Sequence, residues 1–250
     1  MRVRYKSPAL GLLWALVVPL VTSLVLAFVF GHLVRIPVGD VPYALFLIVG
    51  LLPWNCVQST IVAATTSIQD NGALVRKTSF PRQLIPASIV LANLINFGCA
   101  LLVVCGIVWA CRVPRYASLW LLPVAFILQT LFTLGMTLLV SAWQAQYRDT
   151  KYVVEMLMTL WFYLTPIIYP ASGLDALGAW TSYTLLLNPM TGVVSVYRAA
   201  LLGWSASGAP ADVPLSLVLS WTAAMTCGVV LYGWHVFRRS APTMADLVQG

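Results

Sequence analysis

Seven long stretches of this chain contain no charged residue, and their length constrains the fold more than any other feature. They cover residues 7–34, 41–69, 83–111, 116–147, 156–174, 176–197 and 213–237. A helix needs roughly 20 apolar residues to cross the hydrocarbon core of a bilayer, and most of these stretches reach that length. Because lipid offers no hydrogen-bond partner, a crossing segment has to be helical. With 60% hydrophobic residues, the sequence predicts an all-α integral membrane protein, a single transmembrane domain over residues 1–250.

The charged residues between the stretches orient the chain. Six spans are predicted, at about residues 9–34, 43–66, 86–111, 117–143, 152–170 and 215–237. Cytoplasmic loops of membrane proteins are enriched in Lys and Arg. One side of this arrangement receives ten basic residues, and the other receives only Arg35, Arg112, Arg115 and Arg198. The richer side is therefore predicted to be cytoplasmic, together with both termini.

The stretch 176–197 is too polar for an ordinary spanning helix. If it crossed fully, the chain would have seven spans and its last two arginines would face outward. We therefore expect residues 171–212 to form a re-entrant segment at the outer face, between spans five and six. Pro166 and Pro170 are expected to end or bend the fifth span near the same face.

Residues 69–86, QDNGALVRKTSFPRQLIP, form the first predicted cytoplasmic loop, which is unusually basic for this chain. Asp70 or Asn71 is suited to cap a short helix, and the apolar residues after them give that helix one apolar side. Two interpretations stay open from the residues alone. The loop either anchors to anionic lipid or docks a cytoplasmic partner that covers the apolar side.

Several segments together resemble the membrane subunits of ABC-2 type exporters, in particular the permeases that export O-antigen and related cell-surface polysaccharides. RYKSPALGLLWALVVPL is similar to that family's entry into its first span, and VGLLPWNCVQSTIVAATTSIQDNGALVRKTSFPRQLIPAS to its second span and first cytoplasmic loop. YRDTKYVVEMLMTLWFYLTPIIYP resembles its junction of spans four and five, LLNPMTGVVSVYRAALL its outer segment, and FRRSAPTMADLVQG its tail. The resemblance runs almost end to end in the family's order.

This resemblance implies a role for the first cytoplasmic loop and a set of partners. In that family the loop carries a coupling helix that inserts into the ATPase subunit. The positions that match it are Asp70, Asn71, Leu74, Val75, Arg76, Lys77, Phe80 and Arg82. The implied assembly has two permeases, with a pore on their two-fold axis, and two ATPase subunits that bind ATP and Mg. It sits in the bacterial inner membrane, contacts membrane lipid and carries a polyprenyl-linked polysaccharide.

One departure from the family concerns the N-terminus. Family members commonly have an amphipathic interfacial helix before the first span, whereas this chain has six residues before Ser7. We expect either that this helix is absent or that the true start lies upstream of Met1.

The chain itself has no residue pattern for chemistry. It lacks the G-x-x-x-x-G-K-[ST] phosphate loop and H-E-x-x-H, and its seven acidic residues are scattered, nearly all in loops. We predict a transporter subunit, with no enzyme activity, no cofactor or metal of its own and no nucleic-acid partner. Arg148, Asp149 and Glu155 open the fifth span. Asp149 is suited to cap that helix, and we hypothesise that Glu155 or Asp149 pairs with an arginine of the first loop or of a partner and takes part in gating.

Aromatic residues near the middle of the spans are candidates for a glycan path, because flat C–H faces of sugars lie well on aromatic rings. At about 100° per residue, Glu155, Phe162 and Tyr169 share one stripe of the fifth span. We expect Phe162 and Tyr169 to line the path, with Trp54 and Trp161 as weaker candidates. The alternative is that all four rings pack between helices.

The cargo stays open at this stage. The same architecture serves a capsular polymer, a teichoic acid precursor, a drug or a lipid. A membrane-embedded lipid-sugar transferase is a further alternative, against which the lack of clustered acids speaks. An ion channel is another, and the chain shows no filter-like segment that would favour it.

Overall fold

The computed structural model describes residues 17–18, 20–34, 36, 38, 41–75, 81–111, 118–147, 149–171, 187–203 and 213–241. Within these ranges the regular elements are helices, which agrees with the predicted all-α membrane protein. Among the described residues, four helices are long and apolar enough to cross a membrane: α2 (Tyr43–Thr65), α5 (Leu84–Ala110), α6 (Leu121–Gln146) and α10 (Leu215–Ser240). They lie over predicted spans two, three, four and six. A shorter apolar helix covers Leu20–His32 and overlaps the π-helical turns of η1 (Ala27–Val34).

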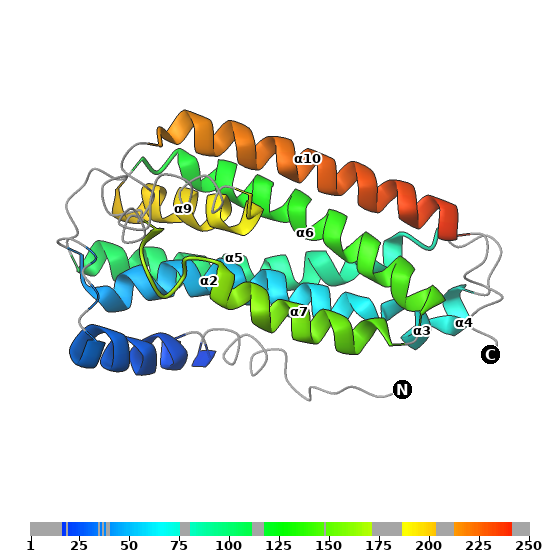
Figure 1. Cartoon of the computed structure of the whole chain (residues 1–250), viewed down its shortest axis with the longest axis horizontal. Coiled ribbons are helices and arrows are strands. Elements are labelled where there is room, and N and C mark those ends of the chain that lie inside the picture. Colours follow the sequence, from blue (N-terminus) through cyan, green and yellow to red (C-terminus); the bar gives the residue numbers. More distant parts are fainter. Residues whose placement is uncertain are drawn as a thin grey trace.

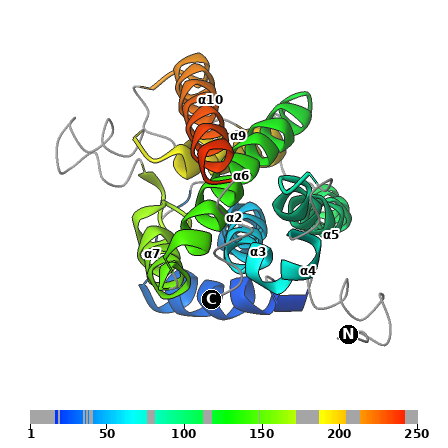
Figure 2. The same cartoon turned by 90° about the vertical axis from the view of Figure 1, so that its right-hand side faces the viewer.

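The long helices lie side by side in an elongated bundle (Figure 1). Helix α2 is central, with α5, α6 and α7 (Thr150–Leu164) around it (Figure 2). It is buried over most of its length, whereas most residues of α5 and α10 are not buried. The short helices α3 (Ser67–Asp70) and α4 (Gly72–Val75) lie at the end of the bundle where α6 and α10 finish, and α9 (Pro189–Leu202) lies toward the opposite end (Figure 1).

Helix α7 is shorter than the predicted fifth span of residues 152–170. It ends at Leu164, and Thr165 is extended, with φ −93° and ψ 131°. Pro166 causes this ending, because proline lacks the N–H of a helix and disfavours the helical conformation of the residue before it. Residues 165–171 therefore continue outside the helix. Phe162 and Tyr169, which were expected on one helical stripe, do not share a helix, and that expectation is wrong.

Helix α9 is buried on every side. Asn188 caps it, its side chain accepting a hydrogen bond from the Met190 N–H, and Pro189 occupies the first turn, where no N–H is needed. Every residue from Met190 to Leu202 is buried, and the helix packs against α2, α6 and α10. Fourteen residues rise only about 21 Å, which is less than the thickness of the hydrocarbon core. A short helix that carries the polar side chains of Thr191, Ser195 and Arg198 therefore lies inside the bundle, covered by protein.

Candidate functional site

The first half of the predicted coupling loop folds into two short helical turns. Asp70 closes α3, where its Oδ2 accepts a hydrogen bond from the Thr66 hydroxyl at 2.8 Å. The Asn71 amide donates to the Ser67 carbonyl oxygen at 2.9 Å. Both side chains therefore stabilise the turn of α3 itself.

The apolar residues of this loop face opposite ways. Val75 is fully buried in a cluster with Ile68, Ile85, Leu138 and residues from the ends of α6 and α10. Leu74 is exposed. The chain itself thus covers Val75, whereas Leu74 stays exposed. Arg82 is half-buried before α5, while Arg76, Lys77 and Phe80 lie outside the described residues.

The start of α7 is capped from an unexpected position. Asp149 stands at the N-cap, but its side chain makes no capping hydrogen bond there, so the predicted cap is wrong. Instead, Gln144 Oε1 accepts the Lys151 N–H at 2.7 Å. Glu155 is exposed on α7. Arg148 lies outside the described residues, so the gating hypothesis stays a prediction.

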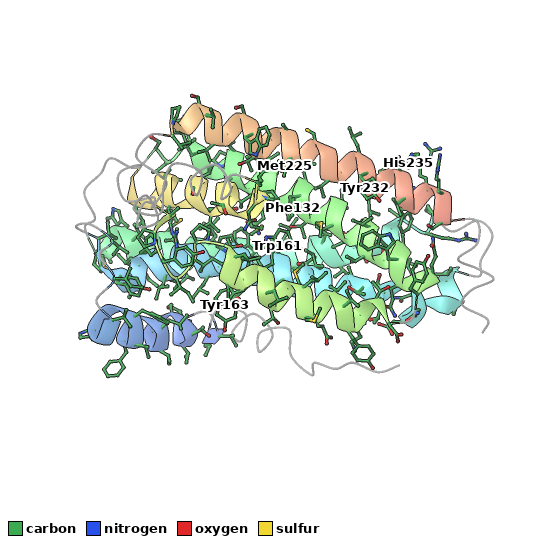
Figure 3. The ribbon with its side chains drawn as sticks, in the orientation of Figure 1. Phe132, Trp161, Tyr163, Met225, Tyr232 and His235 are labelled. Carbon is green, nitrogen blue, oxygen red and sulfur yellow. The ribbon has the colours of Figure 1, made fainter. Side chains whose placement is uncertain are left out.

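Three of the four predicted path residues form one ring cluster. Trp54 of α2 meets Trp161 edge-on at 5.9 Å between ring centroids, and Phe162 at 5.8 Å. Phe132 of α6 meets Trp161 at 5.9 Å, and these two rings lie close together between α6 and α7 in Figure 3. Trp54 is fully buried, whereas Trp161 and Phe162 are partly exposed. The cluster therefore packs α7 onto α2 and α6 and leaves the rings of Trp161 and Phe162 partly accessible.

A hydrogen-bonded triad anchors Trp161. Its Nε1–H donates to Asn188 Oδ1 at 2.8 Å, and the same oxygen caps α9. The Asn188 amide donates to the Thr165 hydroxyl oxygen at 2.9 Å, and that hydroxyl donates back to the Trp161 carbonyl. Tyr169 lies apart from the cluster, with its hydroxyl donating to the Tyr163 carbonyl oxygen at 3.2 Å. The end of α7 and the start of α9 are thus tied together by the residues next to the rings.

The predicted position of Arg198, at the outer face of the membrane, is wrong. Counted among the cations of the outer aqueous side, Arg198 is instead 1% exposed inside the bundle. Its Nη1 and Nη2 donate to the carbonyl oxygens of Pro166 at 2.8 Å and Ile167 at 2.7 Å, and its Nε to that of Phe46 at 3.3 Å. The guanidinium also lies 3.5 Å from the centre of the Phe46 ring. The non-helical backbone after α7 supplies the acceptors that make this burial possible.

A signal for part of this arrangement was present in the sequence. The prolines after α7 free carbonyl oxygens, and Asn188 followed by Pro189 is a helix start. These signals locate the end of one helix and the start of the next, but neither indicates that the arginine of the second helix is buried against that end. In the part of the chain that the structure describes, no group of three metal-ligating side chains occurs.

A bundle of long apolar helices with a buried polar corner defines a multi-pass membrane protein. The family model described as ABC-2 type transporter matches residues 1–202. The O-antigen export system permease protein RfbA of Myxococcus xanthus is 33% identical over 229 residues, which cover 90% of this chain and 86% of that protein. RfbA of Klebsiella pneumoniae is 31% identical over 79% of this chain and 75% of its own length. The polysialic acid transport protein KpsM of Escherichia coli is 24% identical over 97% and 91%.

The chain belongs to the ABC-2 type transporter family. The resemblance stated from its sequence motifs is thereby confirmed, and the chain is a transporter membrane subunit.

Proposed function

We propose that this chain is the permease subunit of an ATP-driven exporter that moves a polyprenyl-linked, O-antigen-like polysaccharide across the bacterial inner membrane. The observation that carries the proposal is its 33% identity, over nearly the full length of both proteins, to a permease named for O-antigen export. The partly exposed rings of Trp161 and Phe162 support it, since they offer apolar faces to sugar.

The proposed assembly has two copies of this chain and two ATPase subunits that bind ATP and Mg. Each copy crosses the membrane six times with both termini in the cytoplasm, and the segment after α7, including α9, re-enters from the outer side. The shortness and full burial of α9 support this topology. In this orientation α3 and α4 lie at the cytoplasmic face, where Asp70 and Leu74 are open to the ATPase.

Loss of export on deletion is the expected result that tests the proposal. Without the gene, lipid-linked glycan is expected to accumulate on the cytoplasmic face of sealed inner-membrane preparations, while surface glycan disappears and synthesis continues. Complementation with the wild-type gene serves as the control. Normal surface glycan in the deletion strain would contradict the polysaccharide assignment and favour a drug or lipid as cargo.

A second polymer class is favoured by one observation. The similarity to KpsM covers 97% of this chain, although at only 24% identity. A capsular polymer handled by the same architecture is therefore the alternative cargo. Chemical analysis of the glycan that accumulates in the deletion strain distinguishes the two.

Removing the rings predicted to contact sugar is expected to slow export. Phe162→Ala combined with Tyr169→Ala should lower the export rate roughly fivefold, equivalent to about 1 kcal/mol, at a normal protein level. Tyr152→Ala is the matched control, because Tyr152 is an exposed ring on the same helix. Unchanged glycan length and export rate in the double variant would remove both rings from the path.

A further inference from the structure

Gln144 joins three elements at the end of the bundle where α3 and α4 lie. It is 4% exposed, near the end of α6. Its Nε2 donates to Gln69 Oε1 of α3 at 3.2 Å, and Gln69 Nε2 donates back to the Gln144 carbonyl oxygen at 3.1 Å. Its Oε1 accepts the Lys151 N–H of α7. One buried amide thus connects the first cytoplasmic loop, α6 and α7.

Each of these hydrogen bonds is costly to lose. A buried amide without partners costs about 1–3 kcal/mol, and the first N–H groups of a helix have no partner within the helix itself. Both ends of the Gln144 amide therefore favour keeping Gln69 and the start of α7 in fixed positions. Any displacement of α3 therefore either breaks these hydrogen bonds or moves Gln144 and the start of α7 with it.

The remaining contacts of α7 make this connection important for its first turns. Between Lys151 and Leu160, only Val154 and Met158 are buried. The ring cluster holds the other end of the helix, near Trp161. At its beginning, α7 is thus attached through Val154 and through the cap that Gln144 provides.

The loop side of the connection is held more firmly. Ile68 of α3 and Val75 of α4 are fully buried, in one cluster with Leu138 and Ala142 of α6. Gln69 lies on the exposed side of α3, beside Asp70. A partner that displaces this side of α3 therefore acts directly on the residue that is bonded to Gln144.

We propose that the Gln69–Gln144 pair transmits the displacement of the first cytoplasmic loop to the start of α7, so that ATPase-driven motion reaches the ring cluster through this helix. The inference rests on the proposed function, in which that loop receives the ATPase. Gln144 and Gln69 are positioning residues here. Neither is assigned any contact with cargo or nucleotide.

The test measures glycan exported per ATP hydrolysed by the complete complex in proteoliposomes. Gln69→Met removes the link to Gln144 and leaves the α7 cap in place. Gln144→Met removes the side-chain bond to Gln69 and the α7 cap, and it leaves only the bond from Gln69 Nε2 to the carbonyl oxygen of residue 144. We expect ATP hydrolysis within about twofold of wild type and an at least tenfold lower export per ATP for Gln144→Met, with a smaller loss of the same kind for Gln69→Met. Because Gln69 is exposed, its variant tests the proposal even if Gln144→Met fails to fold.

Gln146→Met is the matched control. Gln146 lies two residues further along, and its Nε2 donates to the Ser240 hydroxyl of α10. Its replacement disturbs a neighbouring contact without touching α3 or α7, so export per ATP is expected to stay normal. Wild-type export per ATP in both Gln69→Met and Gln144→Met would overturn this inference but not the proposed function. An equal loss of export per ATP in Gln146→Met would do the same. A wild-type complex that hydrolyses ATP without moving glycan would overturn the proposed function and the inference with it.

Discussion

Replacing Arg198 by methionine is expected to destabilise the folded protein by about 2–4 kcal/mol. Methionine keeps most of the volume of the side chain but reaches none of its three acceptors. The Phe46 oxygen lies inside α2 and keeps its helical partner, whereas those of Pro166 and Ile167 lie in non-helical backbone. Two buried carbonyl groups without donors cost about 1–3 kcal/mol each. Burying methionine requires no desolvation of a charge. The net loss of stability is therefore smaller than the sum of the two carbonyl penalties at their upper limit.

Lysine at position 198 separates the importance of charge from that of shape. An ammonium is a compact, strongly hydrated point charge, while the planar guanidinium binds acceptors in a fixed fork. Lysine cannot bridge the oxygens of Phe46, Pro166 and Ile167 together and still has to be buried. We therefore expect Arg198→Lys to be no more stable than Arg198→Met. Recovery of wild-type stability by lysine would show that charge alone matters.

The measurement is the amount of monodisperse protein extracted from membranes, with the midpoint of unfolding in mixed micelles. Arg239→Met is the control, because Arg239 is exposed in the last turn of α10, and it is expected to behave as wild type. Gly50→Ala tests the same corner without removing the arginine. A Cβ at Gly50 would lie 2.6 Å from Arg198 Nη2, so a smaller loss in the same direction is expected. Equal unfolding midpoints for Arg198→Met and wild type would contradict this account of the corner.

Hydrophobic runs located the long helices well, and the physical reason is the thickness of the membrane. Predicted spans 43–66 and 215–237 correspond to α2 at Tyr43–Thr65 and α10 at Leu215–Ser240. Such segments are defined by their length and by the absence of charge, and both are local properties of the sequence. The end of α7 before Pro166 also follows from a local signal, the proline itself. Because the helix ends there, Tyr169 does not lie on the helical stripe that was expected to include it.

The polar corners could not be found in this way, because they depend on partners distant in the chain. Arg198 binds oxygens 31 and 32 residues away, and Gln144 binds Gln69 at a separation of 75 residues. Counting cations per loop treats every arginine as a residue at the membrane surface. Whether a cation or an amide is buried instead depends on which backbone groups another segment leaves free. The periodicity of one segment carries no information about that.

Replacing Gly135 or Gly233 by alanine is expected to have the other large effect, a loss of about 3 kcal/mol or more. Helices α6 and α10 form the most extensive helix pair among the described residues, and these glycines let their backbones meet. A Cβ at Gly135 would lie 2.8 Å from the Val230 N and Cα atoms, and one at Gly233 would collide with the Gly135 carbonyl oxygen. Overpacking usually costs 1–3 kcal/mol, and here the obstacle is backbone that no rotamer change can move.

Gly228, which lies on α10 like Gly233, provides a control for which the opposite effect on stability is expected. A Cβ there meets nothing within 4 Å, so Gly228→Ala should be neutral or stabilise by up to about 1 kcal/mol through its better helix propensity. Unfolding midpoints in mixed micelles compare the three variants. Because Gly135 and Gly233 share one contact, their double variant should lose less than the sum of the single losses. Alanine at position 233 with wild-type stability would contradict the close crossing of α6 and α10.

The same variants separate stability from coupling. Helix α10 holds α6 in place through this crossing, and α6 in turn carries Gln144 at its end. Gly233→Ala should therefore lower total export in proportion to the amount of folded protein while export per ATP stays constant. A Gln144 variant should lower export per ATP while the amount of folded protein changes less. If Gly233→Ala also lowered export per ATP, the loss in the Gln144 variant would not be specific to the connection between α3 and α7.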